Sequence, residues 1–161
     1  MKMIPLTQGQ VALVDDEDFE RFGHLEWGAL KRKDGTFYAV GSNPIYREKP
    51  HTIYLHRAIM GVTDPKIDVD HKNHDTLDCR RRKNLRICTR SQNMANRKGS
   101  QSNSISGTRG VSWHVKSGKW TACLQVNKRY IYLGVFKKKE DAAAAYAVAN
   151  REHFGEFGGG L

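Results

Sequence analysis

The stretch of sequence that decides the fold is VDHKNHDTLDCRRRKNLRICTRSQN, residues 69–93. An extended run ends near its start, which places Asp70 and His71 at the end of a strand. A polar, arginine-rich loop follows over 72–83, and the chain is expected to return as a second short strand over Asn84–Ile87. The first part of the stretch therefore predicts a strand, a loop and a returning strand.

A helix is expected next, because Thr89 and Gln92 have the spacing of a capping box. It should begin at Ser91 and run towards Lys98, with Asn93 in its first turns. From there Asn93 can face the strand that carries the histidine. The whole stretch is thus a predicted β-loop-β-α unit.

The residue types of this unit suit hydrolysis of a phosphodiester bond. Histidine has an unperturbed pKa of about 6.5, so His71 is a candidate general base. A hard divalent cation prefers oxygen ligands, and Asp70 and Asn93 supply a carboxylate and an amide oxygen. Asn96 is the rival amide ligand, and Asn84 is expected to hold the backbone or ring of His71 in position.

Positive charge is concentrated on the same stretch. The chain has 161 residues and a formal net charge of +10, yet residues 1–78 are net acidic. Residues 79–100 carry eight basic and no acidic side chains, and 101–161 are again basic. This distribution indicates a polyanionic partner, with an ordinary solvated loop as the alternative. The residues expected to contact phosphate are Arg80, Arg81, Arg82, Lys83, Arg86, Arg90 and Arg97.

Composition excludes several classes of protein. With 39% hydrophobic and 27% charged residues, the chain is neither a membrane protein nor a disordered one. No apolar run reaches the roughly 18 residues of a membrane span, and the first residues lack the apolar core of a signal peptide. Cys79, Cys88 and Cys123 have no C-x-x-C spacing, which argues against a disulfide scaffold and a zinc site and favours a reducing cytosol.

Residues 1–60 are expected to form a small strand-rich module. Short β-type runs occur at 11–14, 36–40 and 52–55, and an acidic turn is predicted at 15–18. The module shows no catalytic pattern, which favours a scaffold role.

Beyond a small, polar segment that predicts a flexible linker, the chain predicts a three-stranded antiparallel sheet backed by one helix. Strand signals with a period of two cover 111–115, 120–126 and 129–136. An alanine-rich helix is expected over Lys139–His153, with acidic residues in its first turn.

The predicted sheet leaves one face free. In its last strand, Ile131, Leu133 and Val135 alternate with tyrosines and are expected to pack on the helix. The other face is polar with a basic rim, which suits contact with a DNA groove, although an ordinary solvated face has the same pattern. The residues expected to contact DNA there are Arg109, Ser112, His114, Lys116, Lys119, Thr121, Gln125, Tyr130 and Tyr132.

The set Asp70-His71, Asn84-Leu85-Arg86 and Asn93 resembles the motif of HNH (ββα-metal) endonucleases, in the variant whose final histidine is an asparagine. That variant is typical of homing endonucleases of phages and mobile introns. The resemblance implies that His71 is the general base, that Asp70 and Asn93 bind one divalent cation and that Asn84 organises the motif. The upstream Leu55-His56-Arg57 is similar to a further segment common in these proteins, and its histidine is expected to pack or touch DNA rather than act in catalysis.

The C-terminal part resembles the Apetala-two/ethylene-response-factor (ERF) DNA-binding domain. The resemblance rests on Arg109-Gly110-Val111, Gly118-Lys119-Trp120, Tyr132–Phe136 and the helix start Glu140-Asp141-Ala142-Ala143. It implies a three-stranded sheet that lies in the major groove of DNA.

The predicted fold class is α+β, in four parts. These are an N-terminal β-rich module (1–60), an HNH nuclease core (61–98), a linker (99–106) and an Apetala-two/ERF-like DNA-binding domain (107–161).

The predicted function is a metal-dependent DNA endonuclease of the homing type. One divalent cation, Mg²⁺ or Mn²⁺, is expected as cofactor, and no zinc. The expected partner is double-stranded DNA and no membrane, bound by a monomer or weak dimer in the cytoplasm of a bacterial or phage-infected cell. The alternatives are a non-cleaving DNA-binding regulator with a decayed nuclease core, and an RNA-binding protein.

Overall fold

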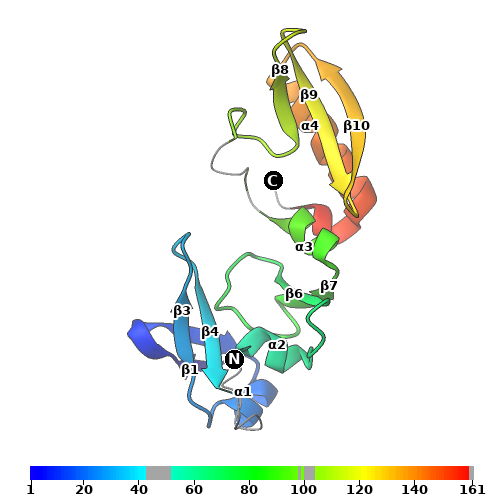
Figure 1. Cartoon of the computed structure of the whole chain (residues 1–161). Coiled ribbons are helices and arrows are strands. Elements are labelled where there is room, and N and C mark those ends of the chain that lie inside the picture. Colours follow the sequence, from blue (N-terminus) through cyan, green and yellow to red (C-terminus); the bar gives the residue numbers. More distant parts are fainter. Residues whose placement is uncertain (43–51, 98, 100–103, 160–161) are drawn as a thin grey trace. The chain divides into compact units, whose positions relative to one another are not determined.

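The computed structural model describes residues 1–42, 52–97, 99 and 104–159, and it divides into two compact units, Met1–Thr89 and Arg90–Leu161 (Figure 1). Small antiparallel sheets and short helices make up both units, which agrees with the predicted α+β class. Over the described ranges, none of the helices combines the length and the apolar character that crossing a membrane requires.

Within its described residues, the first unit contains three small antiparallel sheets, with strand orders β1-β2, β3-β4-β5 and β6-β7. Its elements are β1 (Lys2–Pro5), a 3-10 helix η1 (Thr7–Gly9), β2 (Val11–Val14), α1 (Asp16–Phe22), β3 (Gly28–Lys31), β4 (Phe37–Ser42), β5 (Thr52–Tyr54), α2 (Leu55–Met60), β6 (Asp68–His71) and β7 (Leu85–Cys88).

One hydrophobic core joins the N-terminal strands to the β6–β7 hairpin. Ile4 and Val14 from the first sheet are buried in the same cluster as Leu55, Val69 and Leu85. Burial of each large aliphatic side chain stabilises the fold by roughly 1.5–3 kcal/mol. Residues 1–60 thus share a core with much of the predicted nuclease core, and the predicted boundary between the two stays a prediction.

The acidic turn predicted at 15–18 is wrong, because these residues lead into α1. Asp16, Glu17 and Asp18 form the first turn of this helix. Carboxylates favour a helix N-terminus, and Phe19 and Phe22 of the next turn pack against the core. The apolar face therefore selects a helix where the charges alone suggested a turn.

The run predicted as a strand at 52–55 ends one residue early. Leu55 is the first residue of α2, and Leu55 and Ile59 are both buried. Since positions i and i+4 lie on one face of a helix, this pair packs α2 onto the core. Gly61 ends the helix with a left-handed backbone, φ 67°.

The second unit has a three-stranded antiparallel sheet of order β10-β9-β8, and α4 packs on one of its faces (Figure 1). The strands and the helix agree with the prediction to within one or two residues. Its elements are α3 (Arg90–Asn96), β8 (Val111–His114), β9 (Lys119–Val126), β10 (Arg129–Phe136), α4 (Lys139–Phe154) and a 3-10 helix η2 (Gly155–Gly159).

The inward position predicted for Val135 is wrong, because a β-bulge changes the phase of β10. Tyr132 pairs with Cys123 while Gly134 pairs with Ala122, so one extra residue is inserted in β10. Gly134 has φ 130°, a conformation that favours glycine. Beyond the bulge the alternation is reversed, and Val135 is 43% exposed.

The predicted linker includes residues 100–103, which lie outside the described residues. Its last residue, Ser106, is buried, and its hydroxyl donates a hydrogen bond of 2.6 Å to the carbonyl of Val111. The backbone N–H of Thr108 donates back to the Ser106 hydroxyl at 3.2 Å. Ser106 therefore belongs to a packed turn at the start of the sheet.

Acidic side chains of α1 bind the arginine run of the β6–β7 loop. Asp18 is 1% exposed and forms an ion pair with Arg81, with Arg21 3.5 Å away. Arg82 pairs with Glu17 at 2.7 Å, but both of these side chains are at least 70% exposed. The two neighbouring arginines thus differ in the burial of their partners.

Arg81→Ala should destabilise the first unit by roughly 2–3 kcal/mol, because it leaves the buried Asp18 carboxylate with only the more distant Arg21. Arg82→Ala is the matched control and should cost less than about 1 kcal/mol, since its ion pair is exposed. Urea unfolding of both variants measures the difference. Equal loss of stability in the two variants would show that the pair with the buried Asp18 carboxylate stabilises the fold no more than the exposed pair does.

Candidate active site

The β6–β7 hairpin carries the first two residues of the predicted site. Asp70 and His71 close β6, and the antiparallel register pairs them with Arg86 and Leu85 of β7. Asp70 and His71 are 6% and 5% exposed, so both polar side chains lie inside the first unit. The strand, loop and strand predicted from the sequence are present.

Arg86 holds the carboxylate of Asp70. Its Nε and Nη2 both lie 2.8 Å from the same oxygen, Oδ2, and the two side chains are only 10% and 7% exposed. Hydrogen bonds between charged partners are short and strong, so this pair fixes the orientation of the carboxylate. The contact of Arg86 with phosphate stays a prediction.

Asn84 closes the loop between the two strands. It is 1% exposed, its amide donates 2.6 Å to the carbonyl of Asp78, and its Oδ1 accepts from the N–H of Asn73 at 2.9 Å. The amide of Asn73 in turn donates to the Asp78 carboxylate at 3.0 Å. One buried amide therefore bridges both ends of the loop, which is a geometry suited to the organising role predicted for Asn84.

Aromatic rings pack against His71 and against its ring neighbour His56. The rings of His71 and His56 have centroids 4.9 Å apart at 67°, and Tyr38 lies 6.2 Å from His71 at 71°. Tyr54 contacts both Tyr38 and His56, at 5.8 Å and 5.5 Å. We call Tyr38, Tyr54, His56 and His71 the four-ring cluster.

Burial controls the protonation of both histidines. Desolvation lowers the pKa of His71 to about 4, although Asp70, Asp75 and Asp78 oppose the shift. Desolvation, with His71 and Arg57 as smaller causes, lowers the pKa of His56 to about 3. Both imidazoles are therefore neutral at neutral pH, and neutral imidazole is the form that accepts a proton from water.

The sequence pattern singled out His56 as a residue expected to pack or touch DNA, and it gave Tyr38 no role. The only local signal was the segment Leu55-His56-Arg57. Contact between His56 and His71 depends on α2 packing beside β6, which the sequence pattern does not reveal.

Several arginines that were expected to contact phosphate form ion pairs with carboxylates of the chain. Arg80 binds Asp78 through Nε at 2.6 Å and Nη2 at 2.5 Å, and Arg81 and Arg82 bind α1 as described above. Lys83 is exposed. Asn93, Arg90 and Arg97 belong to the second unit, where Asn93 and Arg90 lie within α3 and Arg97 directly follows it.

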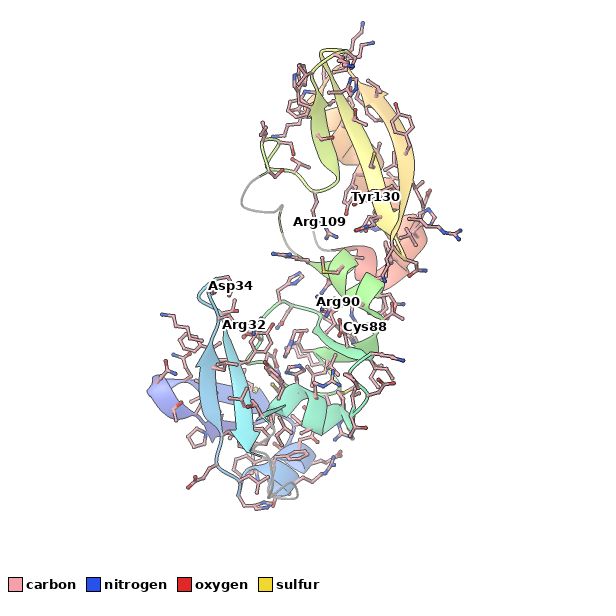
Figure 2. All side chains as sticks on the ribbon, in the orientation of Figure 1. Arg32, Asp34, Cys88, Arg90, Arg109 and Tyr130 are labelled. Carbon is pink, nitrogen blue, oxygen red and sulfur yellow. The ribbon has the colours of Figure 1, made fainter. Side chains whose placement is uncertain are left out.

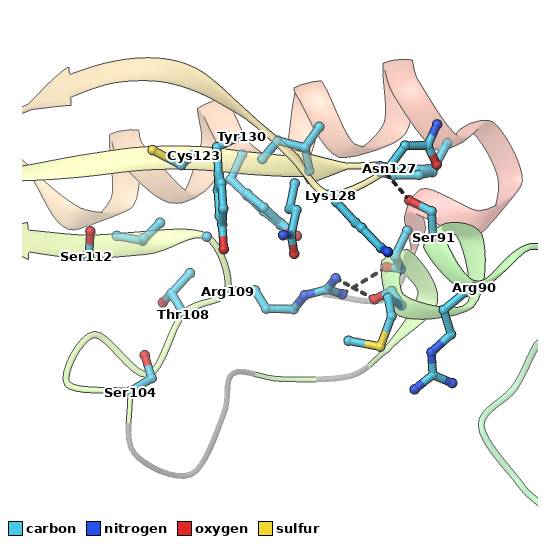
Figure 3. Close-up of a pocket in the computed structure, with 18 residues that line it drawn as sticks. Arg90, Ser91, Ser104, Thr108, Arg109, Ser112, Cys123, Asn127, Lys128 and Tyr130 are labelled. Atoms are coloured by element: carbon cyan, nitrogen blue, oxygen red, sulfur yellow. Dashed lines mark hydrogen bonds between the residues drawn. The ribbon is translucent and has the colours of Figure 1, made fainter.

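Arg109 contacts the C-terminal carbonyls of α3. Its Nη1 donates to the carbonyl of Ala95 at 2.9 Å and its Nη2 to that of Met94 at 2.5 Å (Figure 3). The same Nη1 also donates to the carbonyl of Arg97, directly after the helix, at 2.8 Å. The last carbonyls of a helix lack partners within it, so Arg109 caps α3. At the adjacent Gly110, φ is 66° and a Cβ would lie 2.1 Å from the Tyr146 ring, so only glycine fits there.

The second unit has a cavity of about 670 Å³ beside this cap. Arg109, Lys128 and Tyr130 are among the residues that line it (Figure 3). Tyr130, near the start of β10 (Figure 2), is 76% exposed, and Tyr132 is 63% exposed. Most of the other residues predicted to contact DNA on this sheet are exposed too; these are Ser112, His114, Lys116, Lys119 and Gln125, with Thr121 half-buried.

The donor chemistry of the hairpin fits a hard divalent cation. Asp70 offers a carboxylate oxygen, and Mg²⁺ typically takes one or two carboxylates and keeps several waters. Burial raises the pKa of the Cys79 and Cys88 thiols to about 12, so neither is a thiolate ligand at neutral pH. In the ranges that the structure describes, no group of three or more His, Cys, Asp or Glu side chains is placed to hold a metal.

Acid should destabilise the first unit through His56. Its folded pKa of about 3 lies below the unfolded value of 6.5, so its contribution is complete above pH 6.5 and is lost as pH falls below that value. Between pH 7.5 and pH 5, the free energy of unfolding should fall by about 2 kcal/mol through this residue. His56→Phe should reduce the pH dependence measured by urea unfolding. The same pH dependence in both proteins would contradict the assignment.

Comparison with known proteins identifies part of the chain. Residues 54–95 match a family model described as HNH endonuclease, and the match spans Asp70, His71, Asn84 and Asn93. Searches of curated proteins and of solved structures found no match. The matched segment is about a quarter of the chain and also includes His56. A domain of the HNH endonuclease family model therefore lies at residues 54–95 of this chain.

Proposed function

We propose that the chain is a metal-dependent HNH endonuclease of the homing type, which hydrolyses phosphodiester bonds of double-stranded DNA. A C-terminal DNA-binding domain of the Apetala-two/ERF kind would direct it to its site. The observation that carries the proposal is the buried imidazole of His71 next to the Asp70 carboxylate, on a hairpin that Asn84 closes and that lies within the segment matching the HNH model.

In the proposed reaction, His71 takes a proton from water as the water oxygen bonds to phosphorus. The bond from phosphorus to the 3′ oxygen breaks, and that oxygen leaves and takes a proton from solvent water, giving 5′-phosphate and 3′-hydroxyl ends. Asp70 and Asn93 would hold the Mg²⁺ or Mn²⁺ ion, which when bound would stabilise negative charge on the phosphate and the leaving oxygen. Arg86 fixes the orientation of Asp70, and Asn84 fixes the loop.

The exposed sheet face of the second unit supports DNA binding. Lys116 and Lys119 lie at the β8–β9 turn, and Tyr130 and Tyr132 project from β10 on the side away from α4. Basic side chains attract phosphates, and the polar face would read base edges in the groove. A single active site favours a nick, unless two chains act together on one site.

One observation favours the alternative of a regulator that binds DNA without cutting it. A hydrogen-bonded ion pair with Arg86 already engages the carboxylate that would hold the cation. In a decayed nuclease this ion pair would keep the hairpin folded without a metal. Such a protein would bind DNA without metal and leave the strands intact.

His71→Ala should lower the rate of plasmid cleavage by roughly 10²–10⁴-fold, because it removes the general base. The assay compares nicking of supercoiled plasmid in Mg²⁺ and Mn²⁺, with a chelator as the metal-free arm. His24→Ala, at an exposed histidine of the same unit, is the matched control and should cut like wild type. Equal cutting by the His71 variant would disprove the catalytic assignment, and binding without scission by wild type would favour the regulator.

Replacing Lys116 and Lys119 together with alanine should weaken DNA binding and its dependence on salt. Each lost phosphate contact reduces the slope of log K against log salt by about 0.9. The matched control replaces Lys139 and Arg151 of α4 with alanine. It removes the same amount of positive charge from the helix and should leave the slope of log K against log salt almost unaltered. Binding to random-sequence duplex DNA, with duplex RNA as competitor, measures both pairs. Equal slopes for the two pairs would place the phosphate contacts elsewhere, and preference for RNA would favour an RNA-binding protein.

A further inference from the structure

We propose that His56 is a positioning residue, whose ring holds the imidazole of His71 in the orientation that proton transfer requires. The inference rests on the proposed function, since it assigns a task to a neighbour of the proposed base. It concerns a histidine of the matched HNH segment whose ring packs against the ring of the proposed base.

The fold leaves His56 little freedom to move. Leu55 and Ile59, on either side of it in α2, are 0% and 2% exposed, and they fix the helix on the core. His56 itself is 7% exposed, so its ring lies inside the first unit. Its position is therefore set by the packing of α2 and not by a flexible side chain at the surface.

The ring of His56 packs against the ring of His71 edge to face. The centroids are 4.9 Å apart, whereas the centroids of Tyr38 and His71 are 6.2 Å apart. Edge-to-face contact between rings is favourable and has a specific geometry. The χ2 torsion of histidine is otherwise broad, so a neighbouring ring restricts the direction in which the imidazole nitrogens point.

Two tyrosines also pack against His56. Tyr38 of β4 and Tyr54 of β5 lie 5.8 Å and 5.5 Å from it. The four-ring cluster thus draws its members from β4, β5, α2 and β6, and His56 contacts each of the other three. An aromatic ring at position 56 is what this packing requires.

Orientation matters because a general base must lie within hydrogen-bond reach of the proton that it takes. A displacement of about 1 Å at a reacting group can lower a rate by 10²-fold. Loss of the ring at position 56 should therefore reduce the rate of the chemical step and leave the binding of DNA nearly intact.

The test compares three variants in the full chain: His56→Phe, which keeps a planar ring, His56→Leu, which keeps apolar volume without one, and His56→Ala. The kcat for plasmid nicking should fall about 10- to 100-fold in the leucine and alanine variants and stay within about threefold of wild type with phenylalanine. KM should change less than about twofold in all three. A decrease in kcat for phenylalanine equal to that for leucine, or full activity with leucine, would overturn the proposal.

A second measurement does not depend on nuclease activity. In NMR spectra, the ring-current shift of the His71 imidazole protons should persist in wild type and His56→Phe and be reduced in His56→Leu, where the more distant Tyr38 ring remains. An unchanged shift in the leucine variant would also overturn the proposal. Failure of the proposed function is recognised separately, since wild type would then not cut DNA or His71→Ala would cut like wild type. If alanine prevents folding, the phenylalanine and leucine variants still decide the outcome.

Discussion

The buried ion pair between Asp70 and Arg86 is the contact on which the candidate site depends. Removing two charges from water costs several kcal/mol for each ion, and only close, hydrogen-bonded geometry offsets that cost. A slip of one residue in the β6–β7 register would place Leu85 or Ile87 opposite Asp70 and leave a charge unpaired in the core. The pair therefore selects one register, and this register sets the place of His71 at the strand end.

The order and bounds of several elements could be predicted from local sequence patterns. The strand expected over 129–136 has the same bounds in the structure, and the β6–β7 hairpin follows its predicted order. The bulge next to Gly134 could not be foreseen, because it depends on how β10 pairs with β9. Similarly, α1 forms because Phe19 and Phe22 pack against the hydrophobic core, and this packing cannot be inferred from the acidic run that precedes them.

Within the candidate site, short-range features were predictable and long-range contacts were not. Asp70, His71 and Asn84 lie within 15 residues of one another, so spacing and strand periodicity already place them together. Arg81 meets Asp18 across 63 positions of sequence, and Tyr38 meets His71 from a different sheet. A run of arginines shows that positive charge is concentrated, but only the fold decides which carboxylates neutralise it.

That neutralisation changes how the basic stretch can act on DNA. Four of its eight basic residues, Arg80, Arg81, Arg82 and Arg86, are ion-paired with carboxylates of the first unit. A phosphate can replace the exposed Glu17 at Arg82 at little cost, because solvated ion pairs are weak. If a phosphate displaced the buried Asp18 or Asp70 from its arginine, a carboxylate would be left unpaired inside the protein. If the chain binds DNA as proposed, the arginines paired with buried carboxylates serve the fold, and the attraction for phosphate comes mainly from Arg82, Lys83 and the basic residues of the second unit.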